Sequence, residues 1–136
     1  MRPLRKLLNI ASENGISLDW FSMQRAESLS LPLPNGEFGV AIDPNKIRSS
    51  ADESCKMAHE IGHCMTGSFY NRYSKLDIRA KHERRADKWA IKKLVPRDEL
   101  RKAVKSGRES RYELAGYFNV TEDFMQKALD YYGSEN

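Results

Sequence analysis

Two histidines and a glutamate in the middle of this chain have the spacing of a metal-binding site. The stretch His59-Glu60-Ile61-Gly62-His63 places the histidines four positions apart, with the glutamate directly after the first. Residues four apart lie on one face of a helix, so both imidazoles can reach one ion while Glu60 lies at the edge of that face. The alternative, two ordinary helix histidines, is disfavoured because the chain contains only 3 histidines. We therefore expect a zinc site on a helix.

A catalytic zinc ion needs a third ligand from elsewhere in the chain. Such an ion takes three protein ligands and leaves the fourth position for water. The longer motif that supplies a glycine and a third histidine further along the chain is excluded, because Thr66 and Phe69 occupy those places. The remaining candidates are His82, Glu83 and Asp87, which share the next predicted helix.

Glu83 is the favoured third ligand. Its carboxylate lies on the core-side face of the helix, where the small residues Ala86 and Ala90 let two helices approach closely. His82 points about 100° away around the helix. Asp87, one turn beyond Glu83, is expected to accept the outer N–H of a ligand histidine and so to fix its ring orientation. Its alternative role is an ion pair with a neighbouring basic residue.

Two histidines and one carboxylate around zinc predict hydrolytic chemistry. The ion would lower the pKa of a bound water to about 7, and Glu60 would take a proton from that water and pass it to the leaving amine. The expected reaction is peptide hydrolysis. Tyr70 and Tyr73 are candidates, by position only, to donate a hydrogen bond to the transition-state oxyanion, and ordinary packing is the alternative for both.

The two cysteines are expected to be free thiols. Cys55 and Cys64 share one predicted helix and lie about 13 Å apart along its axis, which forbids a disulfide between them. Cys55 could in principle bind metal as a thiolate, but we favour a small buried hydrophobic residue because Cys55 and the two histidines span too much of the axis.

The front third of the chain predicts a helix and a small sheet. Residues 2–14 have helical spacing, and residues 16–20 and 37–42 read as strands. Residues 29–33 alternate too, but Pro32 and Pro34 restrict that segment to a sheet edge or a loop. We predict an antiparallel sheet. An extended substrate could add to its edge and lie across the metal, although a purely structural role fits the pattern equally well.

The first metal helix is predicted over residues 50–65. Ser50 with Glu53 matches a capping box at its start. A buried stripe of four residues is expected beside the histidines, and Gly62 inside the helix indicates close approach by another backbone or by substrate. The members of the stripe are Met57, Ala58, Ile61 and Met65.

The remainder of the chain is predicted to be helical. A connecting segment over residues 68–78 leads to a second metal helix over 79–94, which a proline ends. Further helices are expected over 97–105, 109–118 and 121–132.

The last two predicted helices have the spacing of a helix-turn-helix, and a net charge of +4 leaves DNA binding open. The final helix, however, carries Glu122, Asp123 and Asp130 against the single base Lys127, which is a poor face for phosphates. Nucleic acid is therefore not expected as a partner. Packing, or holding a protein substrate, is favoured.

Length and composition predict one α+β domain spanning residues 1–136. Its expected parts are a helix and small sheet (1–48), the two metal-site helices (49–96) and the C-terminal helices (97–136). The small antiparallel sheet would pack on a zincin-like helix bundle. No apolar run is long enough for a signal peptide or a membrane span, which with reduced cysteines indicates a cytoplasmic protein without a membrane partner.

Two motifs together resemble the ImmA/IrrE family of metallopeptidases. The first is the histidine motif at residues 59–63, and the second begins at Glu83 and closes at Pro96. The resemblance implies that one zinc ion per chain is bound by His59, His63 and Glu83, and that Glu60 is the catalytic glutamate. Residues 40–47 correspond to the edge strand of the family.

The resemblance also implies a kind of substrate. Members of the family commonly cut transcriptional repressors of phage, mobile elements or stress regulons. The chain has no room at its N-terminus for the helix-turn-helix domain fused to many members, so we expect a separately encoded repressor as the partner. The alternative is a non-catalytic zinc-stabilised module that sequesters a protein partner or DNA. Glu60 argues against it, because a structural site does not need this residue.

Overall fold

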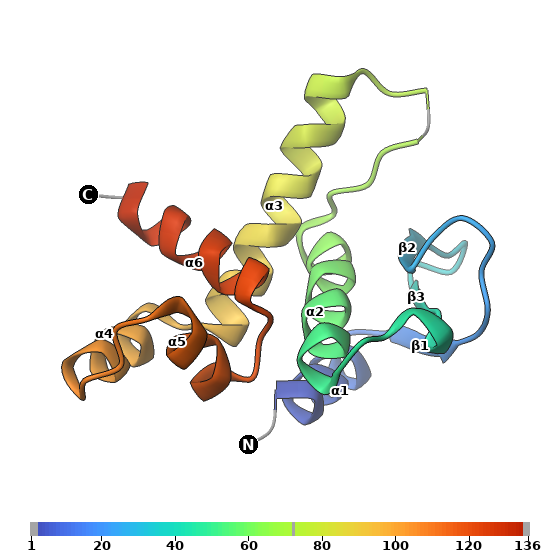
Figure 1. The fold of residues 1–136 in the computed structure, drawn as a ribbon. Helices are drawn as coiled ribbons and strands as arrows, with labels where there is room; N and C mark the ends of the chain where they lie inside the picture. Colours follow the sequence, from blue (N-terminus) through green and yellow to red (C-terminus); the bar gives the residue numbers. More distant parts are fainter. Residues whose placement is uncertain (1–2, 72, 135–136) are drawn as a thin grey trace.

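The chain begins with one helix and three short strands and then continues as helices (Figure 1). The computed structural model describes residues 3–71 and 73–134. The elements in order are α1 (Pro3–Glu13), β1 (Ile16–Trp20), β2 (Ser28–Pro32), β3 (Phe38–Ile42), the 3-10 turn η1 (Pro44–Lys46), α2 (Ser50–Thr66), α3 (Leu76–Leu94), α4 (Arg97–Lys105), α5 (Arg111–Phe118) and α6 (Glu122–Ser134). The predicted α+β class is confirmed.

The sheet is mixed, whereas an antiparallel sheet was predicted. Its strand order is β1-β3-β2, with β1 parallel and β2 antiparallel to the central strand β3. The connection after β1 carries the chain to the far side of β3, and strand patterns carry no information about which neighbour a strand pairs with. Residues 40–47 therefore do not form an edge strand: residues 40–42 lie in β3, the central strand. The edge strand on the site side is β2.

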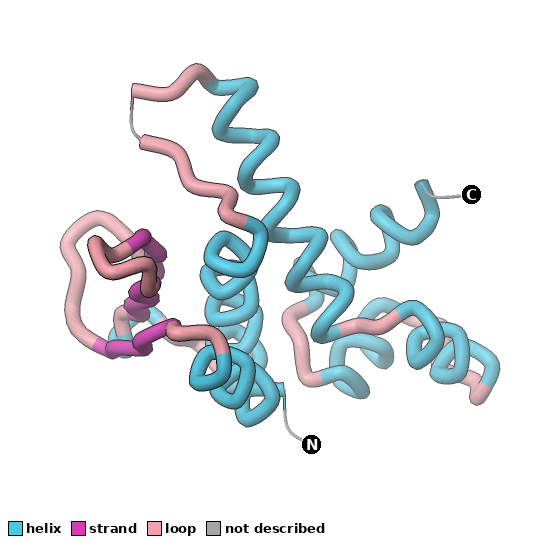
Figure 2. The backbone as a smooth tube through the Cα atoms, turned by 180° about the vertical axis from the view of Figure 1, so that it is seen from behind, coloured by secondary structure: helices cyan, strands magenta, loops and turns pink. Residues whose placement is uncertain are grey.

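Helices α2 and α3 lie between the sheet and the C-terminal helices. In the two opposite views of Figures 1 and 2, the strands lie on one side of this pair and α4, α5 and α6 on the other. Buried side chains from both sides meet on α2, where Met57 is 1% exposed and Ala58 and Ile61 are fully buried. The helix that carries the histidines is thus held from two directions.

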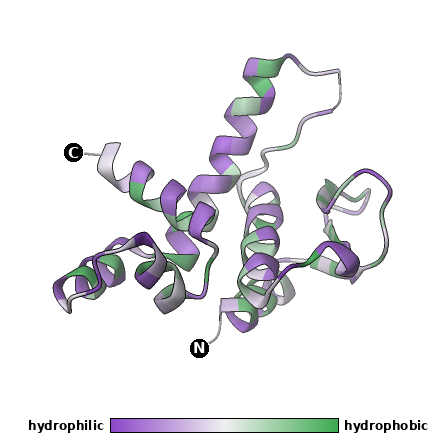
Figure 3. Cartoon of the chain, viewed as in Figure 1, coloured by the Kyte–Doolittle hydropathy of each residue, from purple (hydrophilic) through white to green (hydrophobic). Residues whose placement is uncertain are grey.

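The end of the predicted buried stripe is wrong. Met65 is 39% exposed, although His63 and Cys64 in the same turn of α2 are buried. The first residue of α3, Leu76, is 78% exposed. Figure 3 shows hydrophobic colouring at this end of the helix.

Helix boundaries differ from the predictions by a few residues. The N-cap of α2 is Ser49, whose hydroxyl accepts a hydrogen bond from the backbone N–H of Asp52, one position before the predicted capping box. Helix α3 begins at Leu76 instead of residue 79. The negative charge of Asp77 in the first turn interacts favourably with the positive end of the helix dipole, which stabilises this earlier start. At the chain's end α6 continues through Gly133 to Ser134. Arg2, within the first predicted helix, and Arg72 lie outside the described residues.

Among the described residues, no helix has both the length and the apolar character needed to cross a lipid bilayer.

Candidate metal centre

A glycine brings the two central helices into close contact. A Cβ atom added at Gly62 of α2 would lie 2.7 Å from the carbonyl oxygen of Ala86 on α3. No side chain fits in that space, so the close approach that the sequence indicated is an approach of α3's backbone. At this separation, side chains one turn away on the two helices can reach the same metal ion.

Three potential ligand atoms converge where the helices meet. Oε2 of Glu83 lies 3.0 Å from Nε2 of His59 and 2.6 Å from Nε2 of His63, and the two Nε2 atoms are 3.2 Å apart. All three atoms lie within 4.8 Å of one another. Two imidazole nitrogens and a carboxylate oxygen are the donor set of many catalytic zinc sites. This group could therefore hold a metal ion.

The other candidates for the third ligand lie elsewhere. His82 stacks on Tyr70 with ring centroids 6.2 Å apart, and its Nδ1 is buried without a hydrogen-bond partner. Oδ1 of Asp87 lies 2.7 Å from Nδ1 of His59, on the opposite side of the ring from Glu83. Only Glu83 of the three reaches the two Nε2 atoms.

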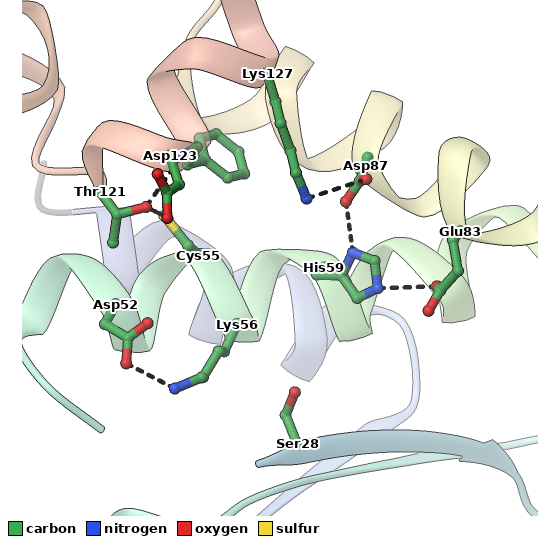
Figure 4. Close-up of a pocket in the computed structure, with 11 residues that line it drawn as sticks. Ser28, Asp52, Cys55, Lys56, His59, Glu83, Asp87, Thr121, Asp123 and Lys127 are labelled. Atoms are coloured by element: carbon green, nitrogen blue, oxygen red, sulfur yellow. Dashed lines mark hydrogen bonds and ion pairs between the residues drawn. The ribbon is translucent and has the colours of Figure 1, made fainter. Parts of the chain in front are cut away.

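Each histidine is held through its outer nitrogen. Nδ1 of His59 faces the carboxylate of Asp87, and Nδ1 of His63 faces the backbone carbonyl oxygen of Ser68. A proton on each Nδ1 satisfies these acceptors and leaves Nε2 free to bind a cation. Figure 4 shows the chain of contacts continuing to Lys127 of α6, whose Nζ lies 3.5 Å from Oδ2 of Asp87.

The contacts within the cluster favour positive charge on the two histidines and negative charge on Glu83. Burial by itself lowers the pKa of His59, but hydrogen bonds with Asp87 and Glu83 outweigh it and raise this pKa to about 10. His63 follows the same balance, with burial opposed mainly by Glu83, and its pKa is raised. Hydrogen bonds from both histidines hold the pKa of Glu83 well below its usual range. An arriving cation would replace a proton here, which is the usual behaviour of metal sites.

Glu60 faces the sheet, where two hydroxyls contact its carboxylate. The residue is 7% exposed. Ser28 donates to Oε2 and Ser30 donates to Oε1, both over 2.7 Å. Sequence reasoning missed these serines because they belong to no motif, and the only available signal was their alternation on one face of a strand.

A cavity of about 240 Å³ opens beside Glu60. Its walls include His63 and Glu83, so the carboxylate and two of the three potential ligands face one space. Tyr70 also lines this cavity, and its hydroxyl donates a hydrogen bond to Oε1 of Glu83 over 3.0 Å. Tyr73 is 80% exposed and lines neither this cavity nor the next. Of the two candidate tyrosines, the structure brings Tyr70 to the site.

A second cavity, of about 440 Å³, lies on the other side of the potential ligands. Figure 4 shows its lining, which includes His59 and Lys56 of α2, Lys127 of α6 and Ser28 of β2. Ser28 and Glu83 line both cavities. The cluster therefore has accessible space on two sides.

The cysteines take no part in the cluster. Both are free and buried. Burial raises the pKa of Cys55 to about 11 and that of Cys64 to about 12. Both remain thiols near neutral pH, and Sγ of Cys55 lies 4.0 Å from the hydroxyl of Thr121.

Comparison with known families adds one match. A sequence model described as the IrrE N-terminal-like domain, a peptidase domain, matches residues 40–130. The matched segment includes the histidine pair, Glu60 and Glu83, but neither β1 nor β2. No curated protein matches the chain.

Proposed function

Because this chain belongs to the peptidase family of the IrrE N-terminal-like domain, we propose that it is a zinc-dependent endopeptidase that cuts a separately encoded helix-turn-helix repressor. The observation that carries the proposal is the convergence of His59, His63 and Glu83 beside the buried carboxylate of Glu60. A site used only to stabilise the fold would not need a carboxylate in that cavity.

The donor set fits zinc. His59 and His63 would supply nitrogen ligands and Glu83 an oxygen ligand, which leaves a coordination position for water. Bound there, zinc would act as a Lewis acid and make that water acidic near neutral pH. Asp87 and the carbonyl of Ser68 would keep both rings in the required orientation.

Glu60 would act as the general base and then as the general acid. Its carboxylate faces the cavity that His63 and Glu83 line, so it can accept a proton from a water molecule held there. The same carboxyl group would then donate the proton to the leaving amine. Glu60 binds no ligand histidine, so this role does not compete with metal binding.

Tyr70 would stabilise negative charge on the scissile carbonyl oxygen. Its hydroxyl already donates to Oε1 of Glu83, next to the ligand oxygen of the same carboxylate. Rotation of the side chain would redirect this donor into the cavity. A donor that meets the charge only as it develops lowers the barrier more than it tightens substrate binding.

The substrate would bind as an extended segment along β2. This strand is an edge strand, paired on one side only with β3, and three of its residues, Ser28, Leu29 and Ser30, line the cavity of Glu60. An unpaired strand edge can bind a peptide through main-chain hydrogen bonds. The two cavities would then accept side chains on either side of the scissile bond.

A repressor as substrate follows from the family resemblance, and it would place the cleavage in the cytoplasm. Release of the repressed genes of a phage, a mobile element or a stress regulon would be the consequence. Such a substrate must offer an extended segment between folded parts, because only an extended chain can pair with a strand edge.

Substitution of Glu60 by glutamine tests the activity directly. The zinc-loaded protein is incubated with repressors encoded beside its gene, and the products are identified by mass spectrometry. Wild type should cleave one of them, whereas Glu60→Gln should retain zinc by elemental analysis and cleave none. Glu53→Gln, the same change two turns earlier on α2, is the matched control and should cleave normally. Cleavage by Glu60→Gln at the wild-type rate would exclude the mechanism, and biological activity that depends on zinc but survives in Glu60→Gln would favour the sequestering module.

A further inference from the structure

We propose that Ser28 and Ser30 are positioning residues for Glu60: their hydroxyls hold its carboxylate in the plane that faces the cavity. The catalytic consequence rests on the proposed peptidase function, whereas the contact itself does not. Both serines lie outside residues 40–130, so the family match assigns them no role.

The two serines approach the carboxylate from one strand. They are alternate residues of β2, so their side chains lie on the same face of the sheet. Ser28 donates to Oε2 and Ser30 to Oε1, each over 2.7 Å. This length is typical of well-formed hydrogen bonds from a hydroxyl to an oxygen acceptor.

Two donors restrict the glutamate more than one donor can. The terminal torsion of a glutamate side chain is broad, so a single hydrogen bond leaves the carboxylate free to turn about its axis. One hydroxyl on each oxygen fixes the plane. Each carboxylate oxygen still has an unused lone pair, so the group can accept a proton from water without losing either serine.

The strand that carries the serines is itself well supported. Ser28 pairs with Ile42 of β3 and Ser30 with Val40, and these two partners are 0% and 2% exposed. Glu60 is fixed from the other side by α2, whose neighbouring residue Ile61 is fully buried. Glu60 is 7% exposed, and the two serine hydroxyls supply a hydrogen-bond donor to each of its buried carboxylate oxygens. The general base is thus positioned between a buried helix and a paired strand.

The first test asks whether the contact couples the strand to the glutamate. We would measure thermal unfolding of wild type, Ser28→Ala/Ser30→Ala, Glu60→Ala and the triple variant. Removal of both hydroxyls should lower Tm by at least about 5 °C when Glu60 is present and by about 1 °C or less in the Glu60→Ala background. Equal shifts in the two backgrounds would overturn the proposal.

The second test asks whether the contact supports turnover. Zinc-loaded Ser28→Ala/Ser30→Ala should cut the repressor with kcat reduced on the order of a hundredfold, while KM and zinc content stay near wild type. Ser28→Thr/Ser30→Thr keeps both hydroxyls and should restore most of kcat. Ser17→Ala is the control, because this serine of β1 donates to the carbonyl of Phe38, away from Glu60.

The two tests separate the possible failures. An unchanged kcat in the double alanine variant would overturn the positioning role. A wild-type protein that cleaves none of the repressors would refute the proposed function, and the unfolding cycle would then decide alone whether the serines hold Glu60.

Discussion

Oδ1 of Asp87 lies 2.7 Å from Nδ1 of His59, so a carboxylate on α3 orients an imidazole on α2. The same ring faces Glu83, four residues earlier on α3, through its other nitrogen. One helix therefore supplies both a potential metal ligand and the group that holds the partner ligand in place. Interactions of this kind raise the basicity of a ligand histidine and fix its tautomer.

Asp87→Asn should weaken zinc binding without removing it. The amide keeps the volume of the side chain but loses the charge that favours a proton on Nδ1. We expect an affinity lower by about 10- to 100-fold, measured by competition with a chromophoric chelator. Asp98→Asn, at an exposed carboxylate of α4, should bind zinc as wild type does. Equal affinities in the two variants would mean that Asp87 does not orient the ring.

Glu83→Ala should abolish stoichiometric zinc binding, because two histidines alone leave the ion without a third protein ligand. Elemental analysis of the purified protein measures the effect. His82→Gln changes the adjacent residue, which points to Tyr70 instead of to the cluster, and should keep one zinc per chain. Retention of zinc by Glu83→Ala would remove Glu83 from the ligand set.

Gly62→Ala should destabilise the protein although alanine favours helices. The added Cβ would lie 2.7 Å from the backbone oxygen of Ala86, so the helices must separate. Overpacking of this kind costs about 1–3 kcal/mol. Gly116→Ala on α5 is the control, because nothing lies within 4 Å of its added Cβ, and it should be neutral or stabilising by up to about 1 kcal/mol. Chemical denaturation measures both, and equal effects would contradict the close helix contact.

The raised pKa of His59 predicts how the thermal stability of the protein, stripped of metal by a chelator, depends on pH. Although burial lowers the pKa of His59, Asp87 and Glu83 raise it from 6.5 to about 10. A group whose pKa is raised on folding contributes stability that is fully present below its unfolded pKa. This contribution is lost as pH rises through its folded pKa. The Tm of wild type should therefore fall, relative to His59→Gln, between pH 6.5 and about 10. A difference that stays constant across this window would contradict the coupling.

Local features of the site could be predicted from the sequence. The spacing of His59 and His63 places both on one helix face by the geometry of the helix itself, and the small residues beside Glu83 indicated the face that meets the other helix. Gly62 indicated the close approach for the same local reason. Each of these inferences depends on residues within a few positions of one another.

Long-range features could not be predicted. Ser28 and Ser30 precede Glu60 by 32 and 30 residues, and Lys127 follows Asp87 by 40. A hydroxyl or an ammonium group in a sequence does not specify which partner it meets. The wrong antiparallel sheet and the wrong edge strand have the same origin, because strand order depends on how a connection crosses the fold.

The sequence by itself determined which helix carries the histidine pair and which helix carries the candidate third ligand, since helical periodicity is a property of neighbouring residues. The tertiary structure decided that Glu60 lies against β2, that Asp87 faces Nδ1 of His59, and that cavities open on both sides of the cluster. These relationships arise from the packing of α2 between a sheet and a second helix, which local periodicity does not encode.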